Sequence, residues 1–318
     1  MDLSIVIPIK DEAENLLGLL EEITSAINPT GFSYEVIVID DGSRDSSWEV
    51  LTALIEKFPF LRAYRFQFNC GKAAALSLGF SKANGCYVAT LDGDLQDDPL
   101  EIPKMITLLE SGYDLVSGWK KRRHDPWHKT WPSKFFNLTV SLVSGQRLHD
   151  FNCGIKVYRS SVVRFIPLYG DFHRFIPVMA KWQGFRITEM PVVHRARAHG
   201  VSKYGVSRLV SGFLDLLTLL FLKSFGAKPL HFFGLIGMLF ALCGMSIFGY
   251  FGVEWLQTGA LHVRPLLLMG GFSLVMGVQF VSLGLLGEMM NGNKKQVYPV
   301  AGMLPNQKSC REDCNDIS

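Results

Sequence analysis

Four aspartates within seven residues follow an apolar run of strand length in 87-YVATLDGDLQDDPLEI-102. Asp92 ends the apolar run, and Asp94 follows it across a tight turn at Gly93. An Asp-x-Asp pair of this kind can direct two carboxylates into one concavity, and Mg²⁺ in proteins typically takes one or two carboxylates plus the phosphates of a substrate. The pair therefore predicts a site for a divalent cation that is bound together with a phosphorylated ligand.

Two later acids of the same stretch have a structural explanation. Asp98, Pro99 and Glu101 suit the N-cap, N1 and N3 positions of a helix that begins here, and this arrangement satisfies free backbone N–H groups of a first helical turn. We therefore predict that Asp98 and Glu101 cap the helix, whereas capping leaves Asp92 and Asp94 unexplained.

An acidic turn also follows a second apolar run, in 38-VIDDGSRDSSWEVL-51. Asp40 ends the run, and Asp45 or Ser46 suits the N-cap of the next helix. Asp40 and Asp41 either bind a nucleotide or belong to a solvated turn, and this stretch alone does not decide between the two interpretations.

Gly71 and Lys72 suggest a phosphate-binding P-loop, but Phe66 and Ala73 stand where that motif needs a first glycine and a final Ser or Thr. We expect a helix that begins near Gly71 instead. The free N–H groups of its first turn could still face an anion.

Two basic runs come later in the chain, 119-WKKRRHDPWHKTWPSK-134 and 195-RARAHGVSKYG-205. A solvated loop explains either run. The alternative is a site for anionic lipid or phosphate beside a membrane, where each Lys or Arg near an acidic surface contributes about 1 kcal/mol. Together with an acidic metal site at the same edge, the basic runs indicate a ligand with several phosphates.

Apolar runs of strand length alternate with amphipathic stretches of helix length over roughly the first 120 residues. The helical spacing is clear in 12–27 and 46–57. This alternation predicts an α/β fold, with a mostly parallel sheet and helices on both faces, in which ligands bind beyond the carboxyl ends of the strands. The acidic turns follow two such ends. The expected strands are 3–9, 35–40, 61–66, 86–92 and 114–119.

Two long segments, 232–253 and 265–287, contain no charged residue. Each is long enough to cross a bilayer as a helix, for which about 20 residues are needed. Core helices of a large soluble protein are the alternative, but such helices normally keep a polar stripe. Lysines flank the pair at its outer ends and the connecting loop holds few charges, so the positive-inside rule predicts that both termini lie in the cytosol.

These patterns divide the chain into four parts. Residues 1–204 form the expected α/β domain, 205–228 an amphipathic segment in the membrane interface, 229–290 a transmembrane hairpin and 291–318 a polar tail. The net charge of +3 is too small to indicate a nucleic-acid-binding protein. The six cysteines lack the paired spacing of a metal site, and we interpret them as reduced thiols of a cytosol-facing protein.

Taken together, these motifs resemble those of the family 2 glycosyltransferases of GT-A fold. More narrowly, the chain resembles the polyprenyl-phosphate sugar transferases, which include dolichol-phosphate mannosyltransferases and bactoprenol glucosyltransferases. The two apolar segments resemble the bactoprenol branch. The matching stretches are 5-IVIPIKDEAENL-16, 38-VIDDGSRDSSWEVL-51, 69-NCGKAAALSLGF-80, 90-TLDGDLQDDP-99, 149-HDFNCGIKVYR-159 and 195-RARAHGVSKYG-205.

The resemblance implies roles for particular residues. Asp150 occupies the position of the aspartate beside the reacting centre, and Lys120 falls near a position that is often Arg in the family. Lys10 stands where the family usually has an aromatic residue. The nucleotide sugar would be bound by Pro8, Lys10, Glu12, Asp40, Asp41, Asp92, Gly93, Gln96 and Lys120. The metal ligands would be Asp92, Asp94 and Gln96. The catalytic set would be Asp94, Asp150, Arg197 and Lys203, and the lipid phosphate would be bound by Arg197, Ser202, Lys203 and Lys134.

The resemblance also implies an activity. It is the Mg²⁺- or Mn²⁺-dependent, inverting transfer of a hexose, glucose from UDP-glucose, to a polyprenyl phosphate at the cytosolic face of the cell inner membrane. Separately from the resemblance, the glycine-rich apolar segments and their hairpin arrangement favour association into homo-oligomers. A GDP-mannose-dependent mannosyltransferase and a non-catalytic nucleotide-sensing scaffold are the alternatives. A processive polysaccharide synthase would carry a QxxRW signature, and the nearest stretch, 180-AKWQGFRI-187, lacks that order.

Overall fold

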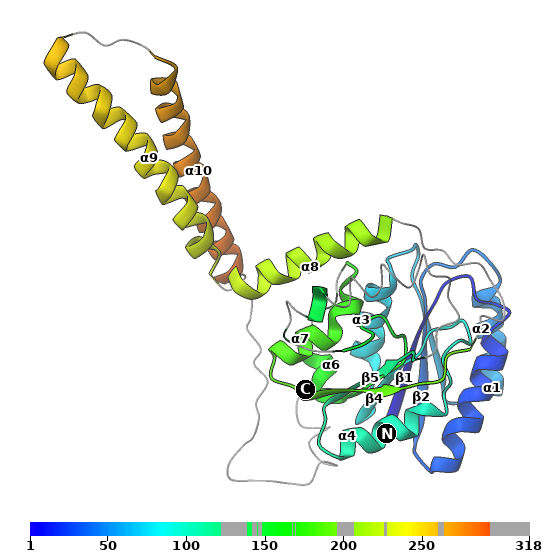
Figure 1. Ribbon diagram of the computed structural model, residues 1–318. Helices are drawn as coiled ribbons and strands as arrows, with labels where there is room; N and C mark the ends of the chain where they lie inside the picture. The colour runs from blue at the N-terminus through cyan, green and yellow to red at the C-terminus, as the bar shows by residue number, and fades with distance from the viewer. Residues whose placement is uncertain are drawn as a thin grey trace. The chain divides into compact units, whose positions relative to one another are not determined.

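The computed structural model describes residues 1–121, 139–141, 145, 148–166, 168, 170–195, 207–225, 228–259 and 264–292 (Figure 1). The chain divides into two compact units, and the division falls between Phe213 and Leu214. The first unit contains the sheet, and the second contains most of α8 together with the two long apolar helices.

A seven-stranded sheet with the order β3-β2-β1-β4-β6-β5-β7 forms the centre of the first unit. All pairs are parallel except those of β6, which runs antiparallel to β4 and β5. The five strands expected from the apolar runs are present, and β6 and β7 were not predicted. The strands are β1 Leu3–Ile9, β2 Tyr34–Asp40, β3 Leu61–Arg65, β4 Tyr87–Thr90, β5 Leu115–Trp119, β6 Lys156–Arg159 and β7 Ile187–Pro191.

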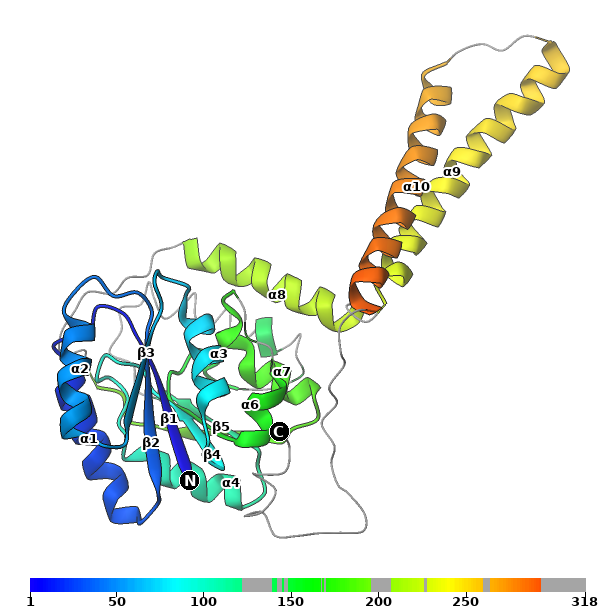
Figure 2. The same ribbon diagram turned by 180° about the vertical axis from the view of Figure 1, so that it is seen from behind.

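Helices cover both faces of this sheet, so the predicted α/β class is confirmed. α1 and α2 lie on one face and α3 on the other (Figure 1 and, from behind, Figure 2). The helices of this unit are α1 Leu16–Ile27, α2 Ser47–Lys57, α3 Lys72–Lys82, α4 Glu101–Glu110, α6 Ser160–Phe165 and α7 Ile176–Trp182, with short 3₁₀ turns η1 Asn28–Thr30 and η2 Phe172–Phe175.

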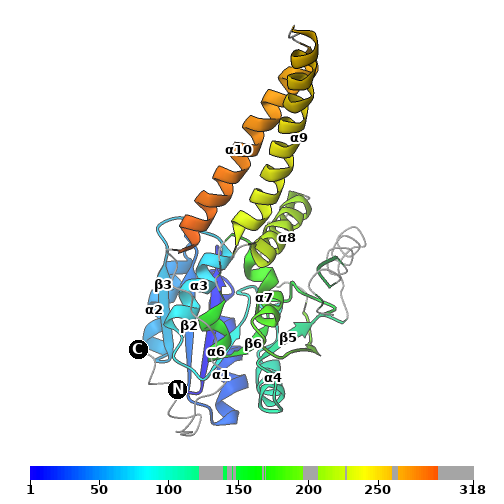
Figure 3. The same ribbon diagram turned by 90° about the vertical axis from the view of Figure 1, so that its left-hand side faces the viewer.

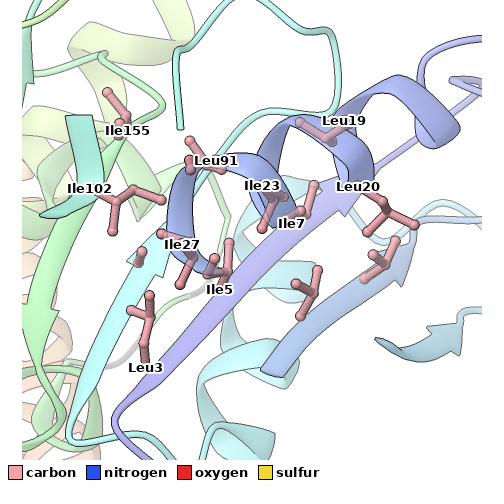
Figure 4. Close-up of a cluster of buried hydrophobic side chains, with 14 of the residues drawn as sticks. Leu3, Ile5, Ile7, Leu19, Leu20, Ile23, Ile27, Leu91, Ile102 and Ile155 are labelled. Atoms are coloured by element: carbon pink, nitrogen blue, oxygen red, sulfur yellow. The ribbon is translucent and has the colours of Figure 1, made fainter. Parts of the chain in front are cut away.

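The main hydrophobic core lies between the sheet and the helices α1, α2 and α4, which cover one of its faces. Alternate residues of β1 point into it, because successive side chains of a strand face opposite sides of the sheet. Figure 4 shows Ile5 and Ile7 of β1 against Ile23 of α1, with Ile102 of α4 beside Leu91. This core fixes the ends of β1 and β4, which carry the acidic loops.

The second unit holds two helices that are long and apolar enough to cross a membrane, α9 Pro229–Thr258 and α10 Pro265–Gly292, after α8 Ser207–Phe225. Only 11% and 17% of their most apolar stretches are buried, so they are not the core helices of a soluble protein. They lie side by side (Figure 3). A Cβ on Gly277 would lie 2.9 Å from the carbonyl oxygen of Gly237, so the small side chains permit this close approach.

Candidate active site

The predicted acidic residues come together at the carboxyl end of the parallel strands. β1 pairs with β2 on one side and β4 on the other, so the loops that follow these three strands leave the same edge of the sheet. Backbone hydrogen bonds tie the loops to β1, because Asp41 N–H donates to Ile9 O at 2.9 Å and Leu91 N–H donates to Val6 O at 3.2 Å.

The loops after β1 and β2 are interlocked by side-chain to backbone hydrogen bonds. Asp11 N–H donates to Ser43 Oγ at 2.9 Å, and Arg44 N–H donates back to Asp11 Oδ1 at 2.8 Å. Asp45 Oδ1 accepts the N–H of Ser47, the first residue of α2, at 3.0 Å. Of the two residues predicted to cap α2, Asp45 therefore makes the side-chain hydrogen bond, whereas Ser46 makes none. The loop that carries Lys10 and Glu12 is held rigidly by these bonds.

Asp40 and Asp41 are buried and bind groups of the chain itself. Asp40 Oδ1 accepts the N–H of Ser43 at 2.8 Å, and its other oxygen lies 3.1 Å from Arg65 Nε. Asp41 Oδ1 accepts the N–H of Cys70 at 2.6 Å and that of Gly71 at 3.1 Å. These N–H groups precede α3, so they do not point freely at an anion. The two acids shape the loop, and their contact with a nucleotide stays a prediction.

Asp92 forms an ion pair with Lys72, the first residue of α3. Burial would raise the pKa of Asp92, but the positive charges of Lys72 and Lys120 outweigh it and hold that pKa well below its usual range. The sequence correctly predicted that α3 begins near Gly71. It did not identify Lys72 as a site residue, because the pairing depends on the crossover that brings α3 to the end of β4.

The Asp-x-Asp turn is tightly packed against β1. A Cβ on Gly93 would lie 2.9 Å from Ile9 Cγ2, so this position requires glycine. Leu95 has a φ of +59°, a left-handed conformation that is strained for a branched side chain and that clusters at functional sites. Asp94 is buried, and its Oδ1 accepts the N–H of Gln96 at 3.3 Å. The Gln96 side chain donates to the carbonyl of Arg195 at 3.3 Å.

Asp97 is a site residue that the sequence reasoning missed. Its side chain is 1% exposed, and neither carboxylate oxygen receives a hydrogen bond from a described residue. Lys120 Nζ lies 3.5 Å from Asp97 Oδ1, and His194 Nδ1 lies 3.6 Å from the same oxygen. The signal was present, since Asp97 is one of the four clustered aspartates, but hydropathy does not distinguish it from its neighbours.

The carboxylates of Asp92 and Asp97 both lie against Gly154, just before β6. A Cβ on Gly154 would lie 2.6 Å from Oδ2 of both aspartates. Lys120 directly follows β5 and is largely buried. Burial lowers the pKa of its ammonium, but the charges of Asp97, Asp92 and Asp150 outweigh burial and raise that pKa above its usual range. Lys120 therefore stays charged.

Asp150 precedes β6 and is 1% exposed, and its Oδ1 accepts the N–H of Asn152 at 3.0 Å. Its charge acts on Lys120 and on Lys156, which places it in the same cluster. Lys156 belongs to β6, is 4% exposed, and donates to the carbonyl oxygen of Cys153. Burial lowers the pKa of Lys156 and raises the pKa of the Cys153 thiol.

The predicted helix cap differs from the structure. α4 begins at Glu101 and is preceded by Leu100, which offers no side-chain cap. Asp98 Oδ1 accepts the N–H of Leu100 at 3.0 Å, so it stabilises the turn before the helix, while Glu101 pairs with Lys104 at 3.1 Å. Asp98 thus makes the side-chain bond predicted for a cap, whereas Glu101 pairs with Lys104 in place of the predicted bond back to Asp98. The bonds from Glu101 N–H to Asp98 O and from Ile102 N–H to Pro99 O make this turn tighter than a first α-helical turn. Asp98 also binds Arg195 at 2.9 Å.

The phosphate-binding half of the prediction lies outside the described residues. Arg197, Ser202, Lys203 and Lys134 all fall there. The structure therefore brings together Asp92, Asp94, Lys120 and Asp150, adds Lys72, Asp97 and Lys156, and leaves the four basic and polar residues of the acceptor site as predictions.

The acidic residues suit a divalent cation that shares its coordination with a ligand. Among the described residues no three His, Cys, Asp or Glu side chains form a metal cage. Mg²⁺ usually takes only one or two carboxylates and completes its shell with water and phosphate oxygens. The buried Asp94 and the Asp97 carboxylate without a hydrogen bond are oxygen donors of the required type. The donor set fits Mg²⁺ or Mn²⁺ bound with a diphosphate.

Comparison with known protein sequences agrees with this chemistry. Residues 4–167 match the family described as Glycosyl transferase family 2. The dodecaprenyl-phosphate galacturonate synthase of Rhizobium johnstonii is 38% identical over 91% of this chain and 88% of its own length. The undecaprenyl-phosphate 4-deoxy-4-formamido-L-arabinose transferase of Pseudomonas fluorescens is 36% identical over 90% of this chain and 84% of its own length.

Solved structures share the fold at lower identity. Glucosyl-3-phosphoglycerate synthase from Mycobacterium tuberculosis, solved with phosphoglyceric acid, has a TM-score of 0.53 at 17% identity, over 70% of this chain and 79% of that one. Its complex with Mn²⁺, UDP and glucosyl-3-phosphoglycerate has a TM-score of 0.52 at 16% identity, with the same coverage. These likenesses support the mostly parallel sheet of GT-A type.

Proposed function

Because the chain belongs to glycosyl transferase family 2, we propose that it transfers a sugar from a nucleoside diphosphate to the phosphate of a polyprenyl lipid. The observation that carries the proposal is the cluster of Asp92, Asp94, Asp97 and Asp150 with lysines at the carboxyl edge of the sheet. A cation and a diphosphate complement such a cluster. The two apolar helices suit an enzyme whose acceptor is a lipid, and both named relatives act on polyprenyl phosphates.

The donor site uses the loops after β1, β2 and β4. Pro8, Lys10 and Glu12 would line the nucleoside side of this edge, where the buried Asp40 and Asp41 hold the loop in shape and are the predicted contacts of the nucleoside. Asp94, Asp92 and Gln96 would hold Mg²⁺ or Mn²⁺, with Asp97 as a further oxygen donor beside them. The cation, when bound, would neutralise charge on the leaving diphosphate. The crystal complex of the M. tuberculosis synthase with Mn²⁺ and UDP supports a divalent cation for this fold.

The reaction forms one bond and breaks one. An oxygen of the lipid phosphate attacks the anomeric carbon, and the bond between that carbon and the β-phosphate oxygen breaks, with its electron pair leaving on the nucleoside diphosphate. The lipid phosphate is already anionic at neutral pH, so no proton has to be removed from it. Lys72 and Lys120 hold Asp92 and Asp97 in place. Asp150, buried beside them, positions the sugar or the acceptor, which lowers the entropic barrier to the attack.

The predicted acceptor residues Arg197, Ser202, Lys203 and Lys134 would bind the lipid phosphate. The two apolar helices and the polyprenyl-phosphate relatives support a place in the cell inner membrane. The flanking lysines support an orientation with both termini in the cytosol. The sugar predicted from resemblance was glucose, and mannose from GDP-mannose was the alternative. The two relatives do not support glucose, since one is a galacturonate synthase and the other a formamido-arabinose transferase.

A transfer assay tests this function. The full chain in detergent is supplied with undecaprenyl phosphate and a panel of labelled nucleotide sugars, with Mg²⁺ or with EDTA. We expect label in the lipid phase from one donor, only when both lipid phosphate and metal are present. Nucleotide binding without lipid product from any donor would overturn the proposal and favour a sensing scaffold.

A further inference from the structure

Lys156 is a buried cation at the centre of the site. It belongs to β6, where it pairs with Thr90 of β4 and Ser117 of β5, and it is 4% exposed. An ammonium has three N–H donors. Among the described residues, the Lys156 ammonium donates to one acceptor, the carbonyl oxygen of Cys153. Buried charges in proteins are normally paired, because an unpaired charge is costly to remove from water.

The other two lysines of the site each have an acid as partner. Lys72 pairs with Asp92, and Lys120 pairs with Asp97. Lys156 makes no ion pair with any carboxylate of the described residues. Burial lowers the pKa of Lys156, the positive charge of Lys72 lowers it further, and Asp150 and Asp92 oppose both effects from beyond ion-pair distance.

We propose that Lys156 binds the carboxylate of a uronic acid, so that the donor is a nucleoside diphosphate uronate. The inference rests on the proposed function and names the substrate class of the same site. A uronate and the matching neutral hexose differ only at carbon 6, where a carboxylate replaces a hydroxymethyl group. The carboxylate would give Lys156 the missing anionic partner and so favour the charged form of the amine.

A site built around a buried polar group discriminates strongly, because a substrate that lacks the matching group leaves the protein group unpaired. Lys156 therefore selects against neutral hexoses as well as for uronates. One of the relatives is a galacturonate synthase, which agrees with a uronate donor. The diphosphate of the donor is a second anion that could reach Lys156, and the test separates the two.

The experiment compares two donors that share UDP and differ at carbon 6, UDP-galacturonate and UDP-galactose, and repeats the comparison with UDP-glucuronate and UDP-glucose. Affinity is measured calorimetrically with the full chain in detergent without lipid, and kcat/KM is measured with undecaprenyl phosphate. The variants are Lys156→Met, which removes the charge at similar volume, and Lys156→Arg, which keeps it. Lys104→Met makes the same chemical change at an exposed lysine of α4.

For the wild-type protein we expect a preference for one uronate over its neutral counterpart of about 100-fold or more. Lys156→Met should reduce this ratio at least tenfold, Lys156→Arg should retain part of it, and Lys104→Met should not change it. A wild-type preference for neutral sugars would overturn the inference. So would an equal loss of affinity for both donors in Lys156→Met, which would assign Lys156 to the diphosphate. If Lys156→Met does not fold, the wild-type and Lys156→Arg ratios decide.

The two proposals fail in different ways. Uronate-selective binding that depends on Lys156, without transfer to lipid, would contradict the proposed acceptor and leave the substrate class supported. Efficient transfer of a neutral sugar to undecaprenyl phosphate would support the proposed function and contradict the role of Lys156.

Discussion

Replacing Gly154 by alanine adds a single methyl group between two carboxylates. The new Cβ would lie 2.6 Å from Oδ2 of Asp92 and from Oδ2 of Asp97, which is 0.8 Å less than the 3.4 Å at which ordinary contact begins. Gly154 O also accepts the hydroxyl of Thr90 at 2.9 Å, so the backbone on this side is anchored to β4. The carboxylates must therefore move by several tenths of an ångström or more.

A displacement close to 1 Å at a reacting centre can reduce the rate about 100-fold, and overpacking costs about 1–3 kcal/mol of folding stability. We expect kcat/KM for lipid transfer to fall about 100-fold in Gly154→Ala, with a modest loss of thermal stability. Gly18→Ala is the control, because its Cβ would meet only Leu95 Cδ1 at 3.8 Å, an ordinary contact between α1 and the loop after β4. Wild-type kcat/KM in Gly154→Ala would refute the reasoning, since it would mean that the two carboxylates can move without affecting the reaction.

Three further predictions follow from contacts outside this glycine. Lys72 holds the pKa of Asp92 well below its usual range, so the pair contributes its full stability above the unfolded pKa of about 4. The contribution declines gradually as pH falls from there and is lost at the folded pKa. Thermal unfolding should show that Lys72→Met destabilises the protein at pH 7 and progressively less as pH falls below 4. Gly277→Leu should lower the thermal stability of the hairpin by about 1–3 kcal/mol, whereas Gly249→Leu, at a glycine with open space around it, should not. Glu189 accepts the backbone N–H of His149 at 2.8 Å and contacts the His149 ring, and His149 directly precedes Asp150 in the chain. Glu189→Gln should therefore lower kcat about tenfold with little change in KM. An unchanged kcat would contradict this positioning role.

The strands that could be predicted are those whose uninterrupted apolar segments are clearly separated from one another in the sequence. β1 to β5 are short hydrophobic segments bounded by polar turns, and they appear within a few residues of the expected limits. β6 was missed because Lys156 and Arg159 interrupt its apolar pattern, and Lys156 is buried only because of the strands on either side. Its antiparallel direction depends on the chain between β5 and β6, which local periodicity does not describe.

The site shows the same division between local and long-range information. Asp92 and Asp94 were recognisable because they directly follow a strand, and the rule that ligands bind beyond the carboxyl ends placed them correctly. The ion pairs Lys72–Asp92 and Lys120–Asp97 join residues from different crossovers, so no local pattern contained them. The bond of Asp98 to the N–H of Leu100 was predicted, but the helix begins later than expected because capping patterns do not distinguish an α-helical first turn from a tighter one.

The most direct test of the central claim compares the wild-type protein with Asp94→Asn in single-turnover transfer to undecaprenyl phosphate. Asp171→Asn, at a half-buried aspartate that pairs with Arg174 outside the acidic edge, serves as the matched control. We predict that label enters the lipid phase with the wild-type protein and with Asp171→Asn, and that Asp94→Asn nearly abolishes the transfer while the fold is retained. Transfer by Asp94→Asn at the wild-type rate would contradict the assignment of this acidic edge as the reacting site.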